Sequence, residues 1–334
     1  MKPYLESTMK AVVVQNYTAI DDVQLAHVPM PELTPGSVRV RVRAVGIGFV
    51  DGLKVQGLYQ TKDPLPFIPG TEFAGEVDGV ADGVSEYSAG MQVMGMVRSG
   101  ALAEYVVVPM EALRILPDGI SPEAGASFRV NYLTAHYALT ERAKLQSGEQ
   151  MLVLGAAGGV GTAAIQLGKI FGARVIAAAS TEEKREFALG LGADAAIDYN
   201  RPNWREELKD LTENRGCDVI VDPVGGAISL EAFRSIAWNG RHLVIGFAAG
   251  NIPALPFNLP LLKGGTLLGV DLAQVPRREP EVYQRTLRDL FRLLGDRRLR
   301  PAVGRIFEFE RFYDAFKTLA GRRALGKVVV RVAR

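Results

Sequence analysis

The sequence predicts an α/β protein with a doubly wound parallel sheet and a second, β-rich domain. The middle of the chain alternates apolar strands with helices, whereas the first 120 residues carry short strands separated by proline and glycine. Alternation of this kind is typical of a parallel sheet covered by helices on both faces. A chain of 334 residues is also longer than one compact core usually is, so about two domains are expected.

The first domain is expected to consist mainly of short strands. They are predicted at residues 9–17, 37–47, 71–80 and 101–109. In SVRVRVRAVGI (37–47), valine alternates with arginine, which is typical of an antiparallel strand with one face in water. Ser121, Pro122 and Glu123 then supply a cap, a first-turn proline and a first-turn acid. They predict the start of a long helix that runs toward Lys144.

The second domain is expected to alternate strands and helices. Strands are predicted at 152–156, 173–180, 195–199, 217–225 and 241–247, with helices between them. Parallel strands joined in this way require right-handed crossover connections.

The last part of the chain is expected to return to the first domain. It contains an amphipathic helix at 283–296, the segment FEFE at 307–310, another helix and a final strand at 327–332. The sequence therefore predicts a discontinuous domain made of residues 1–128 and 270–334, and a continuous domain at 129–269.

Residues 152–161, LVLGAAGGVG, form the most informative segment. A strand, a tight turn and a helix follow one another, as in a dinucleotide site, where the helix N-terminus attracts a pyrophosphate. Gly158 lets phosphate oxygens approach the backbone, and Gly161 lets the helix lie close to the strand. The predicted cofactor residues of this turn are Ala156, Ala157, Gly158, Gly159, Val160 and Gly161. The alternative is a glycine-rich turn that binds nothing.

Several sequence blocks match one known family in the same order. They are PGSVRVRVRAVGIGFVDGLKVQGLY, PFIPGTEFAGEV, SPEAGASF, NYLTAHYAL, GAAGGVG, AAASTEEK, GADAAIDY, DVIVDPVGG and GKVVV. From Met9 onward the chain resembles the zinc-independent quinone oxidoreductase branch of the medium-chain dehydrogenase/reductase superfamily. The resemblance implies a GroES-like substrate domain, a Rossmann domain, an active-site cleft between them, and a homodimer formed through the Rossmann sheets.

The residue types at the zinc positions of this superfamily argue against a metal. Zinc-bearing relatives place a cysteine and a histidine where this chain has Gly48 and Thr71. Neither residue offers the thiolate or imidazole that zinc prefers. The chain has one cysteine, Cys217, and its three histidines show no metal-ligand spacing. We therefore expect no metal, and we expect His136, His242 and Cys217 to be structural.

The end of the second predicted strand favours NADPH over NADH. An NAD-preferring site usually has an acid there, about 20 residues beyond the glycines, but this chain has Ala179. Ser180 can donate a hydrogen bond to a 2′-phosphate, and Lys184 can add a positive charge. The resemblance adds Tyr199 to this pocket. The alternative is that STEEK is only a capped helix start. A helix cap and a phosphate site can also be present together.

Further cofactor and substrate residues follow from sheet geometry and from the resemblance. Gly246 and Phe247 lie at the carboxyl end of one predicted parallel strand, and Val270 and Asp271 lie at the next such edge, where cofactors bind. By resemblance, Asn131 and Thr134 lie near the nicotinamide, Tyr132 near the substrate, and Lys327 near the cofactor. The predicted substrate-pocket residues are Gly48, Phe49, Asp51 and Tyr132.

A hydride donor without a metal suits acceptors that are already electrophilic, such as quinones and α,β-unsaturated carbonyls. Where the family has an asparagine before Phe49, this chain has Gly48, so a side-chain donor is lost. Tyr59 is the remaining candidate for a catalytic hydrogen-bond or proton donor, and it could equally be a half-buried aromatic of the cleft wall. The alternatives are an enoyl-thioester reductase and a non-catalytic NADPH-binding protein of the lens-structural or RNA-binding kind.

The amino-acid composition limits the kinds of partner that the protein is expected to bind. With 39 Lys+Arg and 37 Asp+Glu, the formal net charge of +2 gives no general attraction for nucleic acid. No run approaches the length and apolarity of a membrane span, and no secretory signal pattern follows Lys2. A single cysteine excludes an internal disulfide. We therefore expect a soluble cytoplasmic enzyme that acts on a small molecule, with no nucleic-acid or membrane partner.

Overall fold

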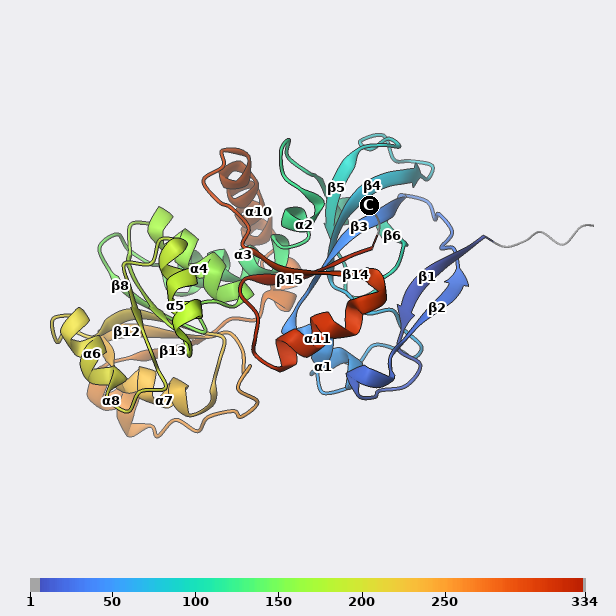
Figure 1. Ribbon diagram of the computed structural model, residues 1–334. Helices are drawn as coiled ribbons and strands as arrows, with labels where there is room; N and C mark the ends of the chain where they lie inside the picture. Colours follow the sequence, from blue (N-terminus) through green and yellow to red (C-terminus); the bar gives the residue numbers. More distant parts are fainter. Residues whose placement is uncertain (1–6, 333–334) are drawn as a thin grey trace, which may run out of the picture. The chain divides into compact units, whose positions relative to one another are not determined.

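The computed structural model describes residues 7–332 and divides the chain into two compact units (Figure 1). The first unit comprises residues 1–130 and 301–334, and the second comprises residues 131–300. One unit is rich in antiparallel strands and the other has a parallel sheet, so the predicted fold class is confirmed. The outermost residues of the predicted first domain, 1–6 and 333–334, lie outside the described residues.

The first unit contains two sheets. Its strands are β1 (Thr8–Val13), β2 (Gln24–Pro29), β3 (Ser37–Ile47), β4 (Glu72–Val80), β5 (Gln92–Met96), β6 (Tyr105–Pro109), β7 (Leu113–Ile115), β14 (Val303–Glu308) and β15 (Lys327–Arg331). The larger sheet has the order β14-β15-β3-β4-β5-β7, with β6 also paired to β3, and β1 pairs with β2. The C-terminal strands β14 and β15 therefore complete a sheet that begins near the N-terminus, and this unit is discontinuous.

Strand β3 shows why the sequence forms this sheet. Val38, Val40 and Val42 are fully buried in the core, whereas Arg39 and Arg43 point to the other face and pair with Asp78 and Glu76 of β4. This is the alternation expected from SVRVRVRAVGI, because successive side chains of a strand point to opposite faces.

Three helices complete the first unit within its described residues. They are α1 (Phe49–Val55), α2 (Pro122–Gly125) and α11 (Phe312–Ala320). Helix α11 packs against β14, β15 and α1, and its buried residues Phe312 and Phe316 join the core of the larger sheet. Short 3₁₀ turns occur at Ile20–Asp22, Met110–Ala112 and Phe309–Arg311.

The long helix predicted between residues 121 and 144 is divided into three pieces. They are α2, α3 (Arg129–Tyr137) and a π-helical segment, Ala138–Arg142. Ser121 caps α2 as predicted, since its hydroxyl accepts the N–H of Ala124. Two hydrogen bonds between residues three apart follow: the N–H of Ser127 donates to the carbonyl of Ala124, and the N–H of Phe128 donates to the carbonyl of Gly125. Bonds of this kind tighten the last turn and end the helix.

The second unit is a six-stranded parallel sheet with the order β10-β9-β8-β11-β12-β13. Its strands are β8 (Gln150–Leu154), β9 (Arg174–Ala178), β10 (Ala195–Ile197), β11 (Cys217–Asp222), β12 (Ile236–Val244) and β13 (Thr266–Gly269). Its helices are α4 (Gly159–Ile170), α5 (Glu182–Gly190), α6 (Trp204–Leu211), α7 (Gly226–Arg234), α8 (Asn258–Lys263), α9 (Val275–Arg278) and α10 (Pro280–Gly295), and a 3₁₀ turn lies at Leu272–Gln274. The carboxyl ends of all six strands lie along one edge, where a doubly wound sheet binds ligands.

The second unit extends further along the chain than the sequence predicts. Residues 270–300 lie with the parallel sheet, and the return to the first unit occurs at residue 301 rather than at 270. Polar contacts explain this correction: Tyr137 donates a 2.8 Å hydrogen bond to Glu279, and Arg285 pairs with Glu141 at 2.9 Å. These contacts bind α10 and the residue preceding it to α3 and the π-helical segment.

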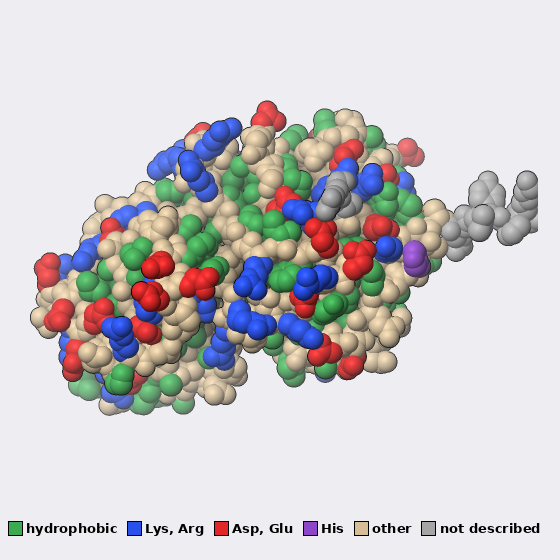
Figure 2. Space-filling model, in the orientation of Figure 1, with side chains coloured by type: hydrophobic (Ala, Val, Ile, Leu, Met, Phe, Trp, Pro, Cys, Tyr) green, Lys and Arg blue, Asp and Glu red, His purple; other side chains and the backbone are tan. Residues whose placement is uncertain are grey.

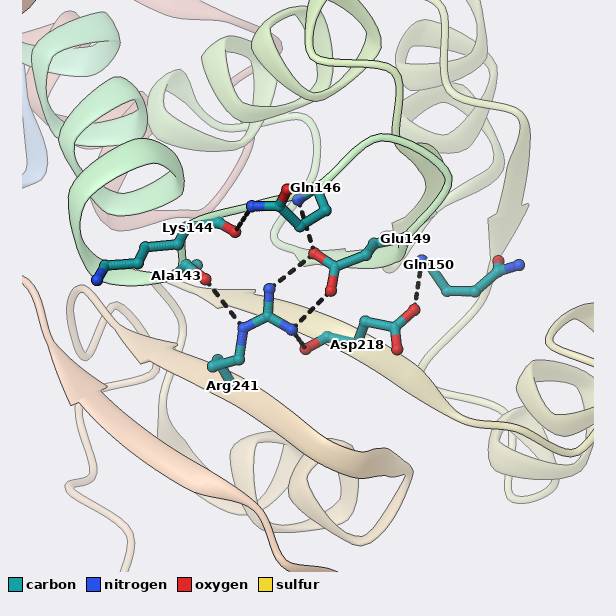
Figure 3. Close-up of polar contacts among 7 residues, drawn as sticks. All are labelled: Ala143, Lys144, Gln146, Glu149, Gln150, Asp218 and Arg241. Carbon is teal, nitrogen blue, oxygen red and sulfur yellow. Dashed lines mark hydrogen bonds and ion pairs between the residues drawn. The ribbon is translucent and has the colours of Figure 1, made fainter.

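A half-buried polar cluster lies at the amino edge of the parallel sheet, opposite the glycine turn (Figure 3). The guanidinium of Arg241 donates two hydrogen bonds to the carboxylate of Glu149, at 2.7 and 2.8 Å, and others to the carbonyls of Ala143 and Asp218. Burial raises the pKa of Glu149, but hydrogen bonds from Arg241 and the N–H of Gln146 outweigh burial, so this pKa lies below its ordinary value. The cluster ties the loop before β8 to β11 and β12, and leaves the opposite edge for a ligand.

The surface carries no large area of one charge on the face that Figure 2 shows. Acidic and basic side chains are mixed there, with apolar side chains between them. Within residues 7–332, the structure contains no helix with the length and apolarity needed to span a bilayer.

Candidate functional site

The predicted glycine turn lies at the carboxyl end of β8. Strand β8 ends at Leu154 and α4 begins at Gly159. The N-cap residue, Gly158, has extended backbone angles and brings no side-chain oxygen to the N–H groups of the first turn. These N–H groups, with the positive end of the helix dipole, form a site suited to a phosphate.

The glycines of this turn have different structural roles. A Cβ at Gly161 would lie 2.5 Å from the carbonyl oxygen of Gly155 and 2.8 Å from the Cα of Ala156, so α4 can approach β8 only with glycine here. At Gly158 the nearest atom to a Cβ would be the Gly155 carbonyl oxygen at 3.3 Å, which is a tight contact but not an overlap. Gly161 thus serves packing, whereas the role of Gly158 in letting phosphate oxygens approach stays a prediction.

Residues of α3 are brought to this turn. A Cβ at Gly159 would lie 2.5 to 2.9 Å from the side-chain amide of Asn131, so the amide rests directly on the turn. Thr134 is buried on the same helix. Tyr132 is also buried, and its hydroxyl donates to the carbonyl of Arg300. Its assignment to the substrate pocket stays a prediction.

The predicted 2′-phosphate residues lie together at the ends of β9 and β10. These strands pair in parallel up to Ala178 and Ile197, and the N–H of Ala179 donates to the Ile197 carbonyl. Ser180 and Tyr199 follow the two strands closely and are half-buried. Thr181 caps α5 by accepting the N–H of Lys184, as expected for a capped helix start. The capped helix start is therefore present, and the contact of Lys184 with a phosphate stays a prediction.

The remaining predicted cofactor residues belong to the ends of β12 and β13. A Cβ at Gly225, after β11, would lie 2.8 Å from the ring of Phe247, so the loops after β11 and β12 touch. Gly246 lies against Pro223, and Val270 donates its N–H to the Val244 carbonyl. Asp271 caps the following 3₁₀ turn by accepting the N–H of Ala273. All these loops lie at the edge that carries the glycine turn.

One group at this edge was missed by the sequence analysis. Asp222, the last residue of β11, accepts hydrogen bonds from the N–H groups of Val224 and Gly225 and from Nε2 of His242. Burial raises the pKa of Asp222, but these bonds outweigh burial, so its pKa is below the ordinary value. The signal was present in the sequence, because Asp222 ends an apolar parallel strand and two glycines follow it closely. Asp222 shapes the loop that contacts Gly155 through Val224.

His136, His242 and Cys217, which the sequence predicts to be structural, are all buried. His242 and His136 are buried, and His242 stacks on Phe233. Cys217 is a buried free thiol, and burial raises its pKa, which disfavours the reactive thiolate.

In the first unit, the predicted pocket residues form a compact polar group around Asp51. This carboxylate is 2 % exposed, and it accepts the N–H of Gly48 and the hydroxyl of Thr71, both at 2.7 Å. Gly48 and Thr71 are the two positions at which zinc-bearing relatives hold a cysteine and a histidine. Here both bind to Asp51 instead.

Lys327 lies beside this group and pairs with Glu72. The Lys327 ammonium contacts the Glu72 carboxylate, whose other oxygen accepts the N–H of Val130. Burial raises the pKa of Glu72 above its ordinary value, although Lys327 opposes that shift. Since Lys327 already has an anionic partner within its own unit, the predicted contact with a cofactor stays a prediction.

The other residues of this region present apolar surface. Phe49 begins α1 and is exposed, together with Val50 and Leu58, while Tyr59 is half-buried on the loop after α1. The arrangement therefore offers an apolar surface and one tyrosine beside a buried polar group.

A zinc ion does not fit this donor set. Gly48 has no donor side chain, the Thr71 hydroxyl is engaged by Asp51, and Glu72 is paired with Lys327. Within residues 7–332, no three His, Cys, Asp or Glu side chains are grouped so that they could hold a metal ion.

The parallel sheet with its glycine turn, together with the β-rich unit, defines a two-domain dehydrogenase or reductase. The chain matches the family models "Alcohol dehydrogenase GroES-like domain" at residues 34–118 and "Zinc-binding dehydrogenase" at residues 159–290. It is 38% identical over 303 residues to quinone oxidoreductase-like protein 2 of Bos taurus, covering 90% of this chain and 86% of the relative.

Solved structures agree with these matches. The quinone oxidoreductase of Thermus thermophilus, which was also determined in complex with NADPH, has a TM-score of 0.84 and 38% identity, covering 97% of this chain and all of that one. An NAD-dependent alcohol dehydrogenase has a TM-score of 0.90 and 31% identity, again covering 97% of this chain and all of that one. The chain belongs to the quinone oxidoreductases of the medium-chain dehydrogenase/reductase superfamily, and it is an oxidoreductase.

Proposed function

We propose that this oxidoreductase uses NADPH to reduce quinones or α,β-unsaturated carbonyls, without zinc. The observation that carries the proposal is the polar group around Asp51, whose carboxylate accepts hydrogen bonds from Gly48 and Thr71, the two residues at the zinc-ligand positions. The other unit of the chain has a glycine turn suited to a dinucleotide. NADPH supplies a hydride when bound. The acceptor must then be electrophilic without help from a Lewis acid.

The cofactor preference is supported at the end of β9. Ala179 brings no carboxylate to the place where an NAD-preferring site holds one, and Ser180, Lys184 and Tyr199 offer two hydroxyls and a cation. One similar structure is named as an NADPH complex and another as an NAD-dependent enzyme, so similarity does not decide between the two cofactors. The preference for NADPH is therefore inferred from the residues of this chain.

The chain's own residues would bind and orient the reactants. The first-turn N–H groups of α4 would hold the pyrophosphate, and Asn131, resting on Gly159, would bind next to it. The exposed Phe49 and Leu58 suit a flat apolar acceptor, and Tyr59 would donate a hydrogen bond to the oxygen on which charge develops. Gly48 leaves this place without the amide donor that the family usually has.

The proposal is tested by an acceptor panel assayed with NADPH and with NADH. The panel contains 1,2-naphthoquinone, an enal, an enoyl thioester and a simple ketone, each measured before and after dialysis against a chelator. We expect NADPH oxidation with the quinone or the enal, little with the ketone, and no loss of activity after dialysis. Tyr59→Phe should lower kcat more than it raises KM, because it removes a hydroxyl and keeps the ring.

Other outcomes select the alternatives. Turnover confined to the enoyl thioester would indicate an enoyl-thioester reductase. Tight NADPH binding without turnover on the whole panel would indicate a binding protein, and the net charge of +2 already weighs against nucleic acid as its partner. Activity lost on chelation and restored by zinc would contradict the metal-free proposal.

We also propose that two copies associate through the outer edge of β13. Among the described strands, β13 has β12 as its only neighbour, so its other edge is open to a second strand. Exposed apolar side chains surround this edge: Trp238, which lies over Gly264, and Leu261, Leu262 and Leu267. A two-fold axis would pair the open edges of two copies and cover these side chains.

Leu267→Lys should convert such a dimer to a monomer, as measured by sedimentation velocity or light scattering. A matched control is Leu189→Lys on α5, since both leucines are 44% exposed. The control should leave the mass unchanged. A wild-type monomer, or a Leu267→Lys protein that remains a dimer, would contradict this interface.

A further inference from the structure

The loops after β9 and β10 contain an acid, Asp198, which lies one strand away from Ala179, the position at which an NAD-preferring site holds its acid. Asp198 directly follows β10 and precedes Tyr199. Strand β10 pairs with β9, which ends just before Ala179. Its carboxylate is held in place: one oxygen accepts the N–H of Asn200 at 3.0 Å, and the Asn200 side chain donates to the carbonyl of Ser180 at 3.1 Å. A negative charge is therefore built into the loops that carry the proposed 2′-phosphate residues.

Arg185 pairs with this acid. Its guanidinium lies 3.1 Å from Oδ2 of Asp198, and both side chains are 17% exposed. The same guanidinium nitrogen donates to the carbonyl of Ala179 at 3.3 Å, which fixes the arginine to the end of β9. Arg201 is a more distant and more exposed neighbour, at 4.0 Å from the same oxygen. Because Arg185 is half-buried and bound at two points, it is the main partner of Asp198.

The pair lies beside open surface. Tyr199, Asn200 and Arg201 line the start of a groove of about 430 Å³ that continues along α6. Asp198 directly precedes Tyr199, and Asn200 links its carboxylate to the Ser180 carbonyl, so a phosphate bound by Ser180 and Tyr199 would lie near Asp198. Two negative charges close together at a partly buried site repel each other.

We propose that Arg185 is a specificity-determining residue that makes NADPH acceptable by neutralising Asp198. This inference rests on the proposed use of NADPH and adds a cause for it. The preference then depends on two features: the absence of an acid at Ala179, and an acid at Asp198 whose charge is cancelled. Without Arg185, the Asp198 carboxylate would keep only the more distant and more exposed Arg201 as a cation, so it would disfavour the 2′-phosphate and leave the 2′-hydroxyl of NADH unaffected.

Binding measurements test this without any need for turnover. Dissociation constants are measured by calorimetry for NADPH, NADH, 2′,5′-ADP and 5′-AMP, with wild type, Arg185→Gln, Asp198→Asn and the double variant. Arg185→Gln should weaken NADPH and 2′,5′-ADP by about tenfold or more, while NADH and 5′-AMP change little. Asp198→Asn in the Arg185→Gln background should restore most of the loss. Arg185→Lys, which keeps the charge, should retain most of the preference.

A matched control separates this role from a general loss of charge. Arg285→Gln removes another arginine of the second unit that is paired with a carboxylate, Glu141, and it should leave the NADPH-to-NADH ratio unchanged. Folding of each variant is checked by circular dichroism and thermal melting. Equal weakening of NADPH and NADH in Arg185→Gln would indicate a merely structural arginine and overturn the inference, as would the absence of rescue by Asp198→Asn. If the wild type binds neither NADPH nor 2′,5′-ADP, the proposed cofactor itself is wrong.

Discussion

Replacing Lys327 with methionine is expected to lower the free energy of unfolding by about 3–5 kcal/mol, because it leaves the Glu72 carboxylate buried without its cation. The Lys327 side chain is 5% exposed and that of Glu72 is 1% exposed, so water cannot replace the lost partner. Urea unfolding followed by circular dichroism measures the change. Both tryptophans, Trp204 and Trp238, lie in the second unit, so their fluorescence reports separately whether that unit is affected.

The effect of Lys327→Met should depend on pH. Burial already raises the pKa of Glu72 above its ordinary value of 4.5, and removing the cation raises it further. The folded variant then binds a proton at Glu72 more tightly than the unfolded chain does, so the contribution of Glu72 to stability is greatest in acid and falls as pH rises above 4.5. The deficit relative to wild type should therefore be smaller at an acidic pH than at an alkaline one.

Two further variants make this prediction decisive. Glu72→Gln in the Lys327→Met background should recover part of the lost stability, because an uncharged amide can still accept the N–H of Val130. Lys317→Met, which removes an exposed ion pair with Asp21 in the same unit, should change stability little. A deficit that is equal at both pH values, or that Glu72→Gln does not relieve, would contradict the buried pair as its cause.

Gly161→Ala is expected to damage both the fold and the proposed cofactor site. The added Cβ would meet backbone atoms of Gly155 and Ala156 within 2.8 Å, and backbone cannot rotate away as a side chain can. Overpacking of this kind costs about 1–3 kcal/mol. Helix α4 must move from β8, so its first-turn N–H groups leave their positions. We expect a lower melting temperature together with a loss of NADPH affinity of about tenfold or more.

Gly158→Ala separates the two roles. Its Cβ would lie 3.3 Å from the Gly155 carbonyl oxygen, a tight contact without overlap, and the backbone angles suit any residue, so stability should fall less than in Gly161→Ala. NADPH affinity should nevertheless fall, because the methyl group occupies the space expected for phosphate oxygens. Gly190→Ala in α5, where no atom lies within 4 Å of a Cβ, is the matched control and should leave binding intact. Full NADPH affinity in Gly158→Ala would show that the phosphate binds elsewhere.

Parts of the candidate site could be found from the sequence because each is encoded within a few residues. The glycine turn is one continuous segment, and Ala179, Ser180 and Lys184 follow it at a spacing set by the helix and strand between them. Asp222 could have been found by the same reasoning, since it directly follows an apolar run. In contrast, the Arg185–Asp198 pair depends on β9 and β10 being neighbours in the sheet, which no local sequence pattern predicts.

The sequence alone determined the fold class, the alternation of β3 and the strand, turn and helix around Gly158, because the period of apolar residues and the backbone freedom of glycine are local properties. Tertiary structure decided where the helix after Ser121 breaks and that residues 270–300 stay with the parallel sheet. It also decided that Lys327 pairs with Glu72 and that Asp51 binds Thr71. These features depend on which distant segments become neighbours, and long-range packing and the pairing of buried charges select them.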